Sequence, residues 1–148
     1  MILFKNIPAI RVNCKTNDVL CGKCCYSTEM ILTIDDILNI INLGFDIKYF
    51  SLFKDGFMRL RNINGHCVFL DVNTNKCKIY NNRPIGCRLY PLVYDPWSDN
   101  VVIDDLCPKS SSLKLSDAEK SYYKKVFKVV IKRAKEAVNF YAKYMSMV

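Results

Sequence analysis

Eight cysteines in 148 residues constrain this chain more than any other feature. Small secreted domains use such sets as disulfides, because their cores are too small to be stable alone. This chain is long enough, and with 51% hydrophobic residues apolar enough, to fold around a core of its own. The cysteines are Cys14, Cys21, Cys24, Cys25, Cys67, Cys77, Cys87 and Cys107.

The start of the chain argues against secretion. It lacks a basic segment followed by an apolar stretch of about 7–15 residues, the pattern of a secretory signal. No apolar run approaches the roughly 20 residues that span a bilayer. We therefore expect a cytoplasmic protein whose thiols are reduced and bind metal. Disulfides are the alternative, because intracellular proteins of hyperthermophiles form them.

The spacing of the first cysteines is typical of a metal site. Cys21 and Cys24 form a C-x2-C pair, whose intervening turn lets two thiolates bind one metal, and Cys25 follows directly. Zinc and a [4Fe–4S] cluster each take four such ligands. Eight cysteines therefore allow two sites, or one site and four further thiols. One or two could simply be buried, because cysteine also packs as a small hydrophobic residue.

Local patterns predict an α+β fold with a small antiparallel sheet and two or three helices, as a single domain over residues 1–148. Capping boxes at Thr33–Asp36 and Ser116–Glu119 predict helices over about 34–43 and about 117–145. A short helix is expected around 46–53.

The strands are expected between the helices. Residues 57–80 are predicted to form strands that turn at Asn64-Gly65, the strongest short hairpin signal, and again at 73–75. A further hairpin is expected between 89–94 and 101–103. Cys67 and Cys77 would then lie on adjacent strands and face each other, and Cys87 would lie in a loop after Arg83-Pro84.

The long C-terminal helix is both amphipathic and basic. Residues 113–148 carry nine of the 22 basic residues against three acids, so most of the net charge of +8 lies there. The lysine face is a candidate contact for the phosphates of a nucleic acid, although such faces are usually just solvated. The apolar stripe is expected to pack in the core. It consists of Tyr123, Phe127, Val130, Ala134, Ala137, Val138, Tyr141 and Met145.

These cysteines stand in a wider motif. Cys21-Gly22-Lys23-Cys24-Cys25, Gly65-His66-Cys67-Val68-Phe69-Leu70-Asp71, Cys77-Lys78-Ile79-Tyr80, Arg83-Pro84-Ile85-Gly86-Cys87-Arg88-Leu89-Tyr90-Pro91 and Cys107-Pro108 follow one another along the chain. The pattern resembles the CxxCxxCC cysteine-cluster family of zinc- or iron-chelating domains, to which a domain of bacterial flagellin lysine N-methylases is related. Six residues separate Cys14 from Cys21, which departs from the family's usual C-x2-C-x2-C-C opening.

The resemblance implies that the eight cysteines hold zinc or an iron–sulfur cluster, and we favour [4Fe–4S]. Arg83 and Arg88 flank Cys87 and could neutralise an anionic cluster or simply hold the loop. His66 is expected to face away from Cys67, because neighbouring residues on a strand point to opposite faces. Asp35 and Asp36 are interpreted as helix-start charges.

Three functions fit these observations. The first is a metal-binding protein in redox or metal-dependent chemistry. The second is an S-adenosylmethionine-dependent lysine methyltransferase, as the resemblance to the flagellin enzymes implies. The third is a nucleic-acid-binding module with a structural metal. The sequence leaves open whether the protein is an enzyme and which partner or substrate it has.

Overall fold

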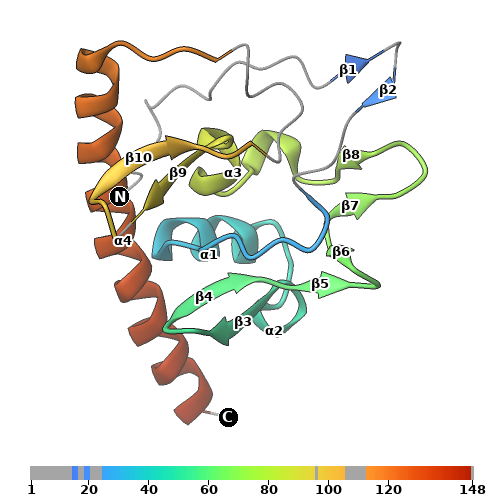
Figure 1. The fold of residues 1–148 in the computed structure, drawn as a ribbon. Helices are drawn as coiled ribbons and strands as arrows, with labels where there is room; N and C mark the ends of the chain where they lie inside the picture. The colour runs from blue at the N-terminus through green and yellow to red at the C-terminus, as the bar shows by residue number, and fades with distance from the viewer. Residues whose placement is uncertain (1–14, 17–18, 21–24, 96, 106–112, 148) are drawn as a thin grey trace.

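The longest helix, α4 (Asp117–Ser146), runs along one side of the molecule, where α1 (Ile34–Asn42), β4 (Phe57–Leu60) and β10 (Asn100–Ile103) lie against it (Figure 1). The structure is a computed structural model that describes residues 15–16, 19–20, 25–95, 97–105 and 113–147. None of the helices in these ranges is long and apolar enough to span a membrane.

Both predicted capping boxes are present. At the start of α1 (Ile34–Asn42), the Thr33 hydroxyl accepts the Asp36 N–H and the Asp36 carboxylate accepts the Thr33 N–H. Ser116 and Glu119 make the same reciprocal pair before α4. Each box satisfies two N–H groups that a helix start otherwise leaves without a partner. The two long helices therefore begin where the sequence predicts.

The described strands pair as five separate antiparallel ribbons rather than as one sheet. Asn64 and Gly65 both have positive φ angles, of 51° and 83°, as a tight two-residue hairpin turn requires. The α+β prediction is confirmed, as are the hairpins at Asn64-Gly65, at 73–75 and before residue 100. The ribbons are β1 (Lys15–Thr16) with β2 (Val19–Leu20), β3 (Ser51–Lys54) with β4 (Phe57–Leu60), β5 (Asn62–Ile63) with β6 (His66–Cys67), β7 (Leu70–Asp71) with β8 (Lys76–Cys77), and β9 (Leu92–Asp95) with β10 (Asn100–Ile103).

The core has two parts, and α4 covers both. One part combines α1, the one-turn helix α2 (Ile47–Phe50), β4 and the segment 67–70 with Ala137 of α4. The other combines the short helix α3 (Ile85–Leu89) and the β9–β10 ribbon with Val126, Phe127 and Val130 of α4. The apolar stripe predicted for this helix is confirmed, except that Met145 is 38% exposed.

An ion pair fixes α4 against α1. Arg133 donates from Nε and Nη2 to the two carboxylate oxygens of Asp35, each over 2.9 Å, and it also contacts Glu136. Asp35 is nearly buried, and two parallel bonds set the orientation of the pair as well as its distance. Asp35 is thus a packing residue between two helices as well as a charge at a helix start.

The segment around Cys87 differs from the prediction. It was expected to be a loop, but residues 85–89 form α3, and a 3-10 turn, η2 (Tyr80–Asn82), precedes it. Helices this short are unstable alone, because fixing the backbone of the first turn costs more free energy than one turn of hydrogen bonds contributes. The contacts that stabilise α3 come from residues distant in sequence and are described with the site below.

Candidate metal centre

The four described cysteines approach one part of the core from four different elements. Cys67 lies on β6 and is 5% exposed, whereas Cys25, Cys77 and Cys87 are half-buried. All four pack in or against the core part that contains α1 and β4. Packing in such a position restricts the orientation of a side chain, and residues that bind one metal ion need fixed orientations.

Backbone pairing brings two of these cysteines to neighbouring positions. Tyr26 forms an antiparallel bridge with His66, and the Ser27 N–H donates to the Gly65 carbonyl over 2.8 Å. One step further along the same register lie Cys25 and Cys67. Successive side chains on a strand alternate between faces, so Cys67 points to the face of β6 opposite His66.

The side chain of Asn62 holds this arrangement in place. Its Oδ1 accepts the Thr28 N–H over 3.0 Å, and its Nδ2 donates to the Thr28 carbonyl over 2.8 Å. The amide thereby imitates a backbone pairing between β5 and the segment that follows Cys25. Asn62 also pairs with Cys67 across the β5–β6 ribbon, so one residue contacts both chain segments.

The predicted facing of Cys67 and Cys77 is wrong in its detail. Cys67 pairs with Asn62 and Cys77 pairs with Leu70, so the two cysteines belong to different ribbons. The reason is that the chain leaves the first ribbon after two residues and starts the next at Leu70. Both side chains nevertheless pack against the same part of the core.

The other four sequence-predicted ligands, Cys14, Cys21, Cys24 and Cys107, lie outside the described residues. Within the ranges that the structure describes, no three Cys, His, Asp or Glu side chains are grouped closely enough to hold a metal ion. The described residues alone therefore do not make up a complete metal site. The donor chemistry fits zinc or an iron–sulfur cluster, because soft thiolates select those metals.

Asp36 caps the helix that carries Cys87. Pro84 stands at the N-cap of α3 and provides no side-chain hydrogen bond. The Ile85 N–H instead donates to Asp36 Oδ1 over 3.0 Å, while Oδ2 accepts the Thr33 N–H. Burial raises the pKa of Asp36 to about 6, although these hydrogen bonds act in the opposite direction. The sequence indicated only the role of Asp36 at α1, because no local signal reveals a partner 49 residues away.

On its other side, α3 approaches the Met30 side chain closely at Gly86. A Cβ atom at Gly86 would lie 2.2 Å from the Met30 sulfur, a distance at which one of the two groups must move. Glycine therefore lets the helix approach Met30 closely, and a larger residue would require the flexible Met30 side chain to shift. Sequence reasoning did not single out this glycine, although its place beside a motif cysteine was a usable signal.

The charged residues of the motif take distinct positions. The Arg83 guanidinium lies 3.9 Å from the centre of the Tyr80 ring, and Nε donates to the Tyr80 carbonyl over 2.9 Å. Arg83 therefore holds the turn before α3. Holding this loop was one of the two roles predicted for it, and neutralising a cluster was the other. Arg88 lies in the last turn of α3, next to Cys87. His66 Nδ1 lies 2.9 Å from the Cys67 carbonyl oxygen, and its ring contacts Tyr26 edge-on.

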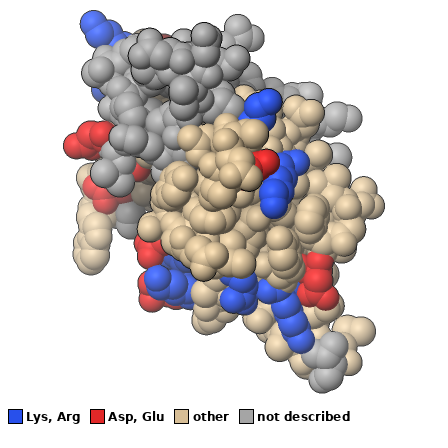
Figure 2. Space-filling view, turned by 90° about the vertical axis from the view of Figure 1, so that its right-hand side faces the viewer, with Lys and Arg blue, Asp and Glu red and all other residues tan. Residues whose placement is uncertain are grey.

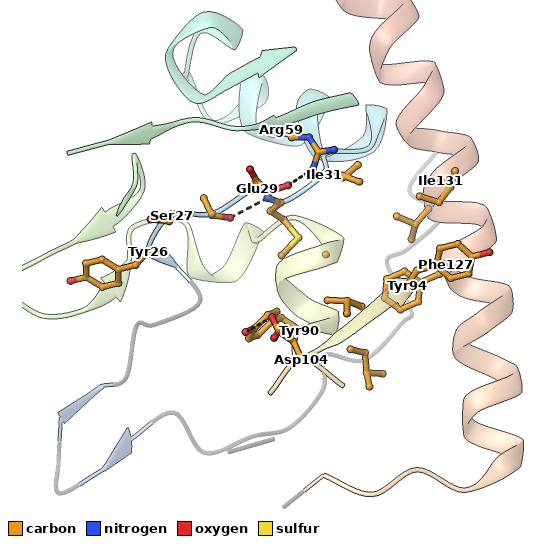
Figure 3. Close-up of a pocket in the computed structure, with 16 residues that line it drawn as sticks. Tyr26, Ser27, Glu29, Ile31, Arg59, Tyr90, Tyr94, Asp104, Phe127 and Ile131 are labelled. Carbon is orange, nitrogen blue, oxygen red and sulfur yellow. Dashed lines mark hydrogen bonds between the residues drawn. The ribbon is translucent and has the colours of Figure 1, made fainter. Parts of the chain in front are cut away.

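A cavity of about 330 Å³ lies beside this site, between the segment 26–31, β9 and α4 (Figure 3). Its wall is mainly apolar and includes Tyr26, adjacent to Cys25, and Gly86, adjacent to Cys87. The Tyr90 hydroxyl donates to Asp104 Oδ2 over 2.9 Å and supplies a polar group at the wall. The size is within the range of small-molecule sites, which begins at roughly 300 Å³.

The sequence matches a family model and a curated relative. The CxxCxxCC model, described as "Putative zinc- or iron-chelating domain", matches residues 13–128. Uncharacterized protein MJ0661 from Methanocaldococcus jannaschii is 35% identical over 94 residues, which cover 53% of this chain and 52% of that protein. The chain thus spans about half the length of this relative. No solved structure matches.

Proposed function

Because this chain belongs to the CxxCxxCC family of zinc- or iron-chelating domains, we propose that residues 1–148 act as one metal-binding domain whose cysteines hold a [4Fe–4S] cluster. The observation that carries the proposal is the register between the Tyr26 and His66 segments. It brings Cys25 and Cys67 to neighbouring positions in the pairing of the two segments. A metal centre shared by these two thiols requires such an approach of segments that are distant in sequence.

The ligand candidates are all eight cysteines: Cys14, Cys21, Cys24, Cys25, Cys67, Cys77, Cys87 and Cys107. A cysteine-only set suits an iron–sulfur cluster, and zinc held by four cysteines is the alternative. The cluster would supply electron transfer, or a metal-dependent step on a bound partner. This chain's own contribution is to orient the thiolates and to exclude water on the side of the core.

Arg88 is the proposed charge partner of the centre. It follows Cys87 directly on α3, and a guanidinium near several thiolates stabilises their negative charge. Arg83 has a positioning role, because its contacts with Tyr80 hold the turn from which α3 begins. Substitution of Arg88 by Met should therefore change the reduction potential of the centre. Substitution of Arg83 should mainly change stability.

The first experiment is to purify the protein without oxygen, record its visible spectrum and assay iron, sulfide and zinc. A brown protein absorbing at about 400 nm, as thiolate-ligated clusters do, with matched iron and sulfide supports the cluster. Bound zinc without colour would replace the cluster with a structural zinc site. Absence of any metal, with the thiols oxidised, would contradict the proposal.

Single substitutions then separate ligation from packing. Ser in place of Cys24, Cys77 or Cys87 should lower both metal content and stability, and full metal retention in all three would refute the proposed ligand set. Cys67 is nearly buried, so Cys67→Val is the matched control for Cys67→Ser. If Cys67 is a ligand, both variants lose metal. If it only packs, valine keeps metal and stability while serine costs stability alone.

The cavity favours a second candidate function. An S-adenosylmethionine-dependent methyl transfer to a lysine would need a small-molecule site near the centre, and the cavity walls include neighbours of Cys25 and Cys87. Its test is the melting temperature of the metal-loaded protein with S-adenosylmethionine in excess. A rise would support the enzyme, because a ligand that binds the folded state stabilises it. An unchanged melting temperature at millimolar ligand would count against it.

A further inference from the structure

The outward face of α4 is a row of lysines: Lys124, Lys125, Lys128, Lys132, Lys135 and Lys143. At about 100° per residue, all six fall within an arc of roughly 100°, and the row is about 28 Å long. All but the half-buried Lys124 are exposed, and the buried residues Phe127, Val130 and Ala134 lie on the opposite side of the helix.

Neighbouring carboxylates neutralise little of the positive charge in this row. Lys124 pairs with Asp99 over 3.3 Å, but within the described residues no carboxylate lies within ion-pair distance of the other five. Glu136, the acid within this stretch of the helix, is bound by Arg133. On the other side of the molecule, which carries β5 to β8, positive and negative side chains are scattered among uncharged ones (Figure 2).

An exposed indole lies in the turn whose Asp99 pairs with Lys124, at one end of this row. Trp97 lies in the turn between β9 and β10 and is 97% exposed. Asp95 accepts hydrogen bonds from the Trp97 N–H over 3.0 Å and from the Ser98 hydroxyl over 2.8 Å. The hairpin tip reaches α4 (Figure 1), where Asp99 pairs with Lys124. Lys128 is near enough to help lower the pKa of Asp99.

We propose that the lysine row and Trp97 together bind a single-stranded nucleic acid, with phosphates along α4 and one base stacked on the indole. Lysines that line a groove or row bind phosphates and release counterions, and exposed aromatic rings stack on unpaired bases. A duplex offers no unpaired base to Trp97. An anionic membrane fits less well, because the apolar face of α4 is buried in the core and cannot enter lipid. This surface does not depend on the metal-binding proposal.

The chain offers a direct assay, because Trp97 is its only tryptophan. The metal-loaded protein of residues 1–148 is titrated with oligouridine and oligothymidine of about 12 nucleotides, longer than the lysine row. Binding should quench the tryptophan fluorescence. At about −0.7 per phosphate, five unpaired lysines predict a slope near −3.5 for the logarithm of the binding constant against that of salt. Tighter binding of the RNA or of the DNA identifies the source of the strand.

Two charge-matched variants test the row. Lys128→Glu with Lys132→Glu should weaken binding of a labelled oligonucleotide at least tenfold and reduce the salt slope by about 1.4. Lys48→Glu with Lys114→Glu has the same net charge, changes two exposed lysines elsewhere and should bind nearly as the parent does. Equal losses in both variants would overturn the proposal, because they would reflect net charge alone.

Trp97 is tested in the same way. Trp97→Ala should weaken binding on the order of tenfold, whereas Trp97→Phe keeps a ring for stacking and should recover most of it. The indole is fully exposed, so both variants should melt as the parent does, and this excludes a folding defect as the cause. The proposal is overturned if neither oligonucleotide quenches the fluorescence, or if the protein binds vesicles of anionic phospholipid or acidic proteins but no oligonucleotide.

Discussion

Replacing Asp36 by Asn tests whether the carboxylate between α1 and α3 is destabilised by its burial. Asparagine has nearly the same shape, but it is neutral at every pH and can accept only one of the two N–H groups, from Thr33 and Ile85, that Asp36 binds. The variant therefore removes the titration of this site and leaves the packing of the two helices largely unchanged.

The magnitude follows from the pKa. The folded-state pKa of about 6 lies above the ordinary value of 3.8, so the folded protein holds the Asp36 proton more tightly than the unfolded chain does. The stabilisation from this proton is fully present below about pH 4 and is lost as the pH rises through about 6. A difference of about two pH units corresponds to roughly 3 kcal/mol in the free energy of unfolding.

The assay is urea unfolding of both metal-loaded proteins between about pH 4 and pH 7, followed by far-ultraviolet circular dichroism. Titrations of the thiols and of other carboxylates occur in both proteins and cancel in the difference. Over this pH range we expect the stability difference to move by about 2.4 kcal/mol in favour of Asp36→Asn as the pH rises. If the stability of the two proteins changes with pH in parallel, or if the difference moves in favour of the parent, the reasoning is refuted. The hydrogen bonds from the two backbone N–H groups would then lower the pKa of Asp36 by at least as much as burial raises it.

Three further variants test other contacts. Arg133→Ala leaves the nearly buried Asp35 carboxylate without its partner and should cost about 3 kcal/mol in urea unfolding. Lys124→Ala breaks the more exposed pair with Asp99 and should cost far less, so similar losses in the two variants would contradict the role of burial. Gly86→Ala should cost no more than about 1 kcal/mol, because its methyl group meets the flexible end of Met30, which can shift. Met30→Ala in the same chain should recover part of this loss, so strictly additive losses would rule out the contact. Asn62→Ala should lower metal affinity, because it removes the two hydrogen bonds that hold the segment after Cys25 against the β5–β6 ribbon. Competition with a chelator measures this affinity, with Asn82→Ala as the control. Equal affinity in the two variants would show that the Asn62 hydrogen bonds do not support the metal centre.

Local signals predicted those parts of the fold that local contacts stabilise. The capping boxes placed the starts of α1 and α4, and Asn64-Gly65 placed a hairpin, because each signal is satisfied within a few residues. The helix α3 was missed because a short Pro- and Gly-containing stretch has little helical tendency of its own. Its stability comes from Asp36 and from packing, which no window around residue 87 contains.

The same division applies to the candidate site. The clustered cysteines predicted that distant segments would meet, and Cys25 and Cys67 do lie at neighbouring register positions. The partner of Cys77 could not be predicted, because strands of two residues are too short for the alternation of apolar and polar side chains to set their pairing. The hydrogen bonds between Asn62 and Thr28 could not be predicted either, because an isolated asparagine in a strand-like segment does not indicate a partner in another segment.

The position of α4 has a consequence for the order of events during synthesis. All eight cysteines precede residue 117, and α4 is the element that covers both parts of the core. A ribosome adding about 5–20 residues per second needs roughly 2–8 seconds to pass from Cys107 to the end of α4. For that interval all eight cysteines have been synthesised, while the helix that covers both parts of the core has not. The core is therefore completed only after the last cysteine has left the site of synthesis.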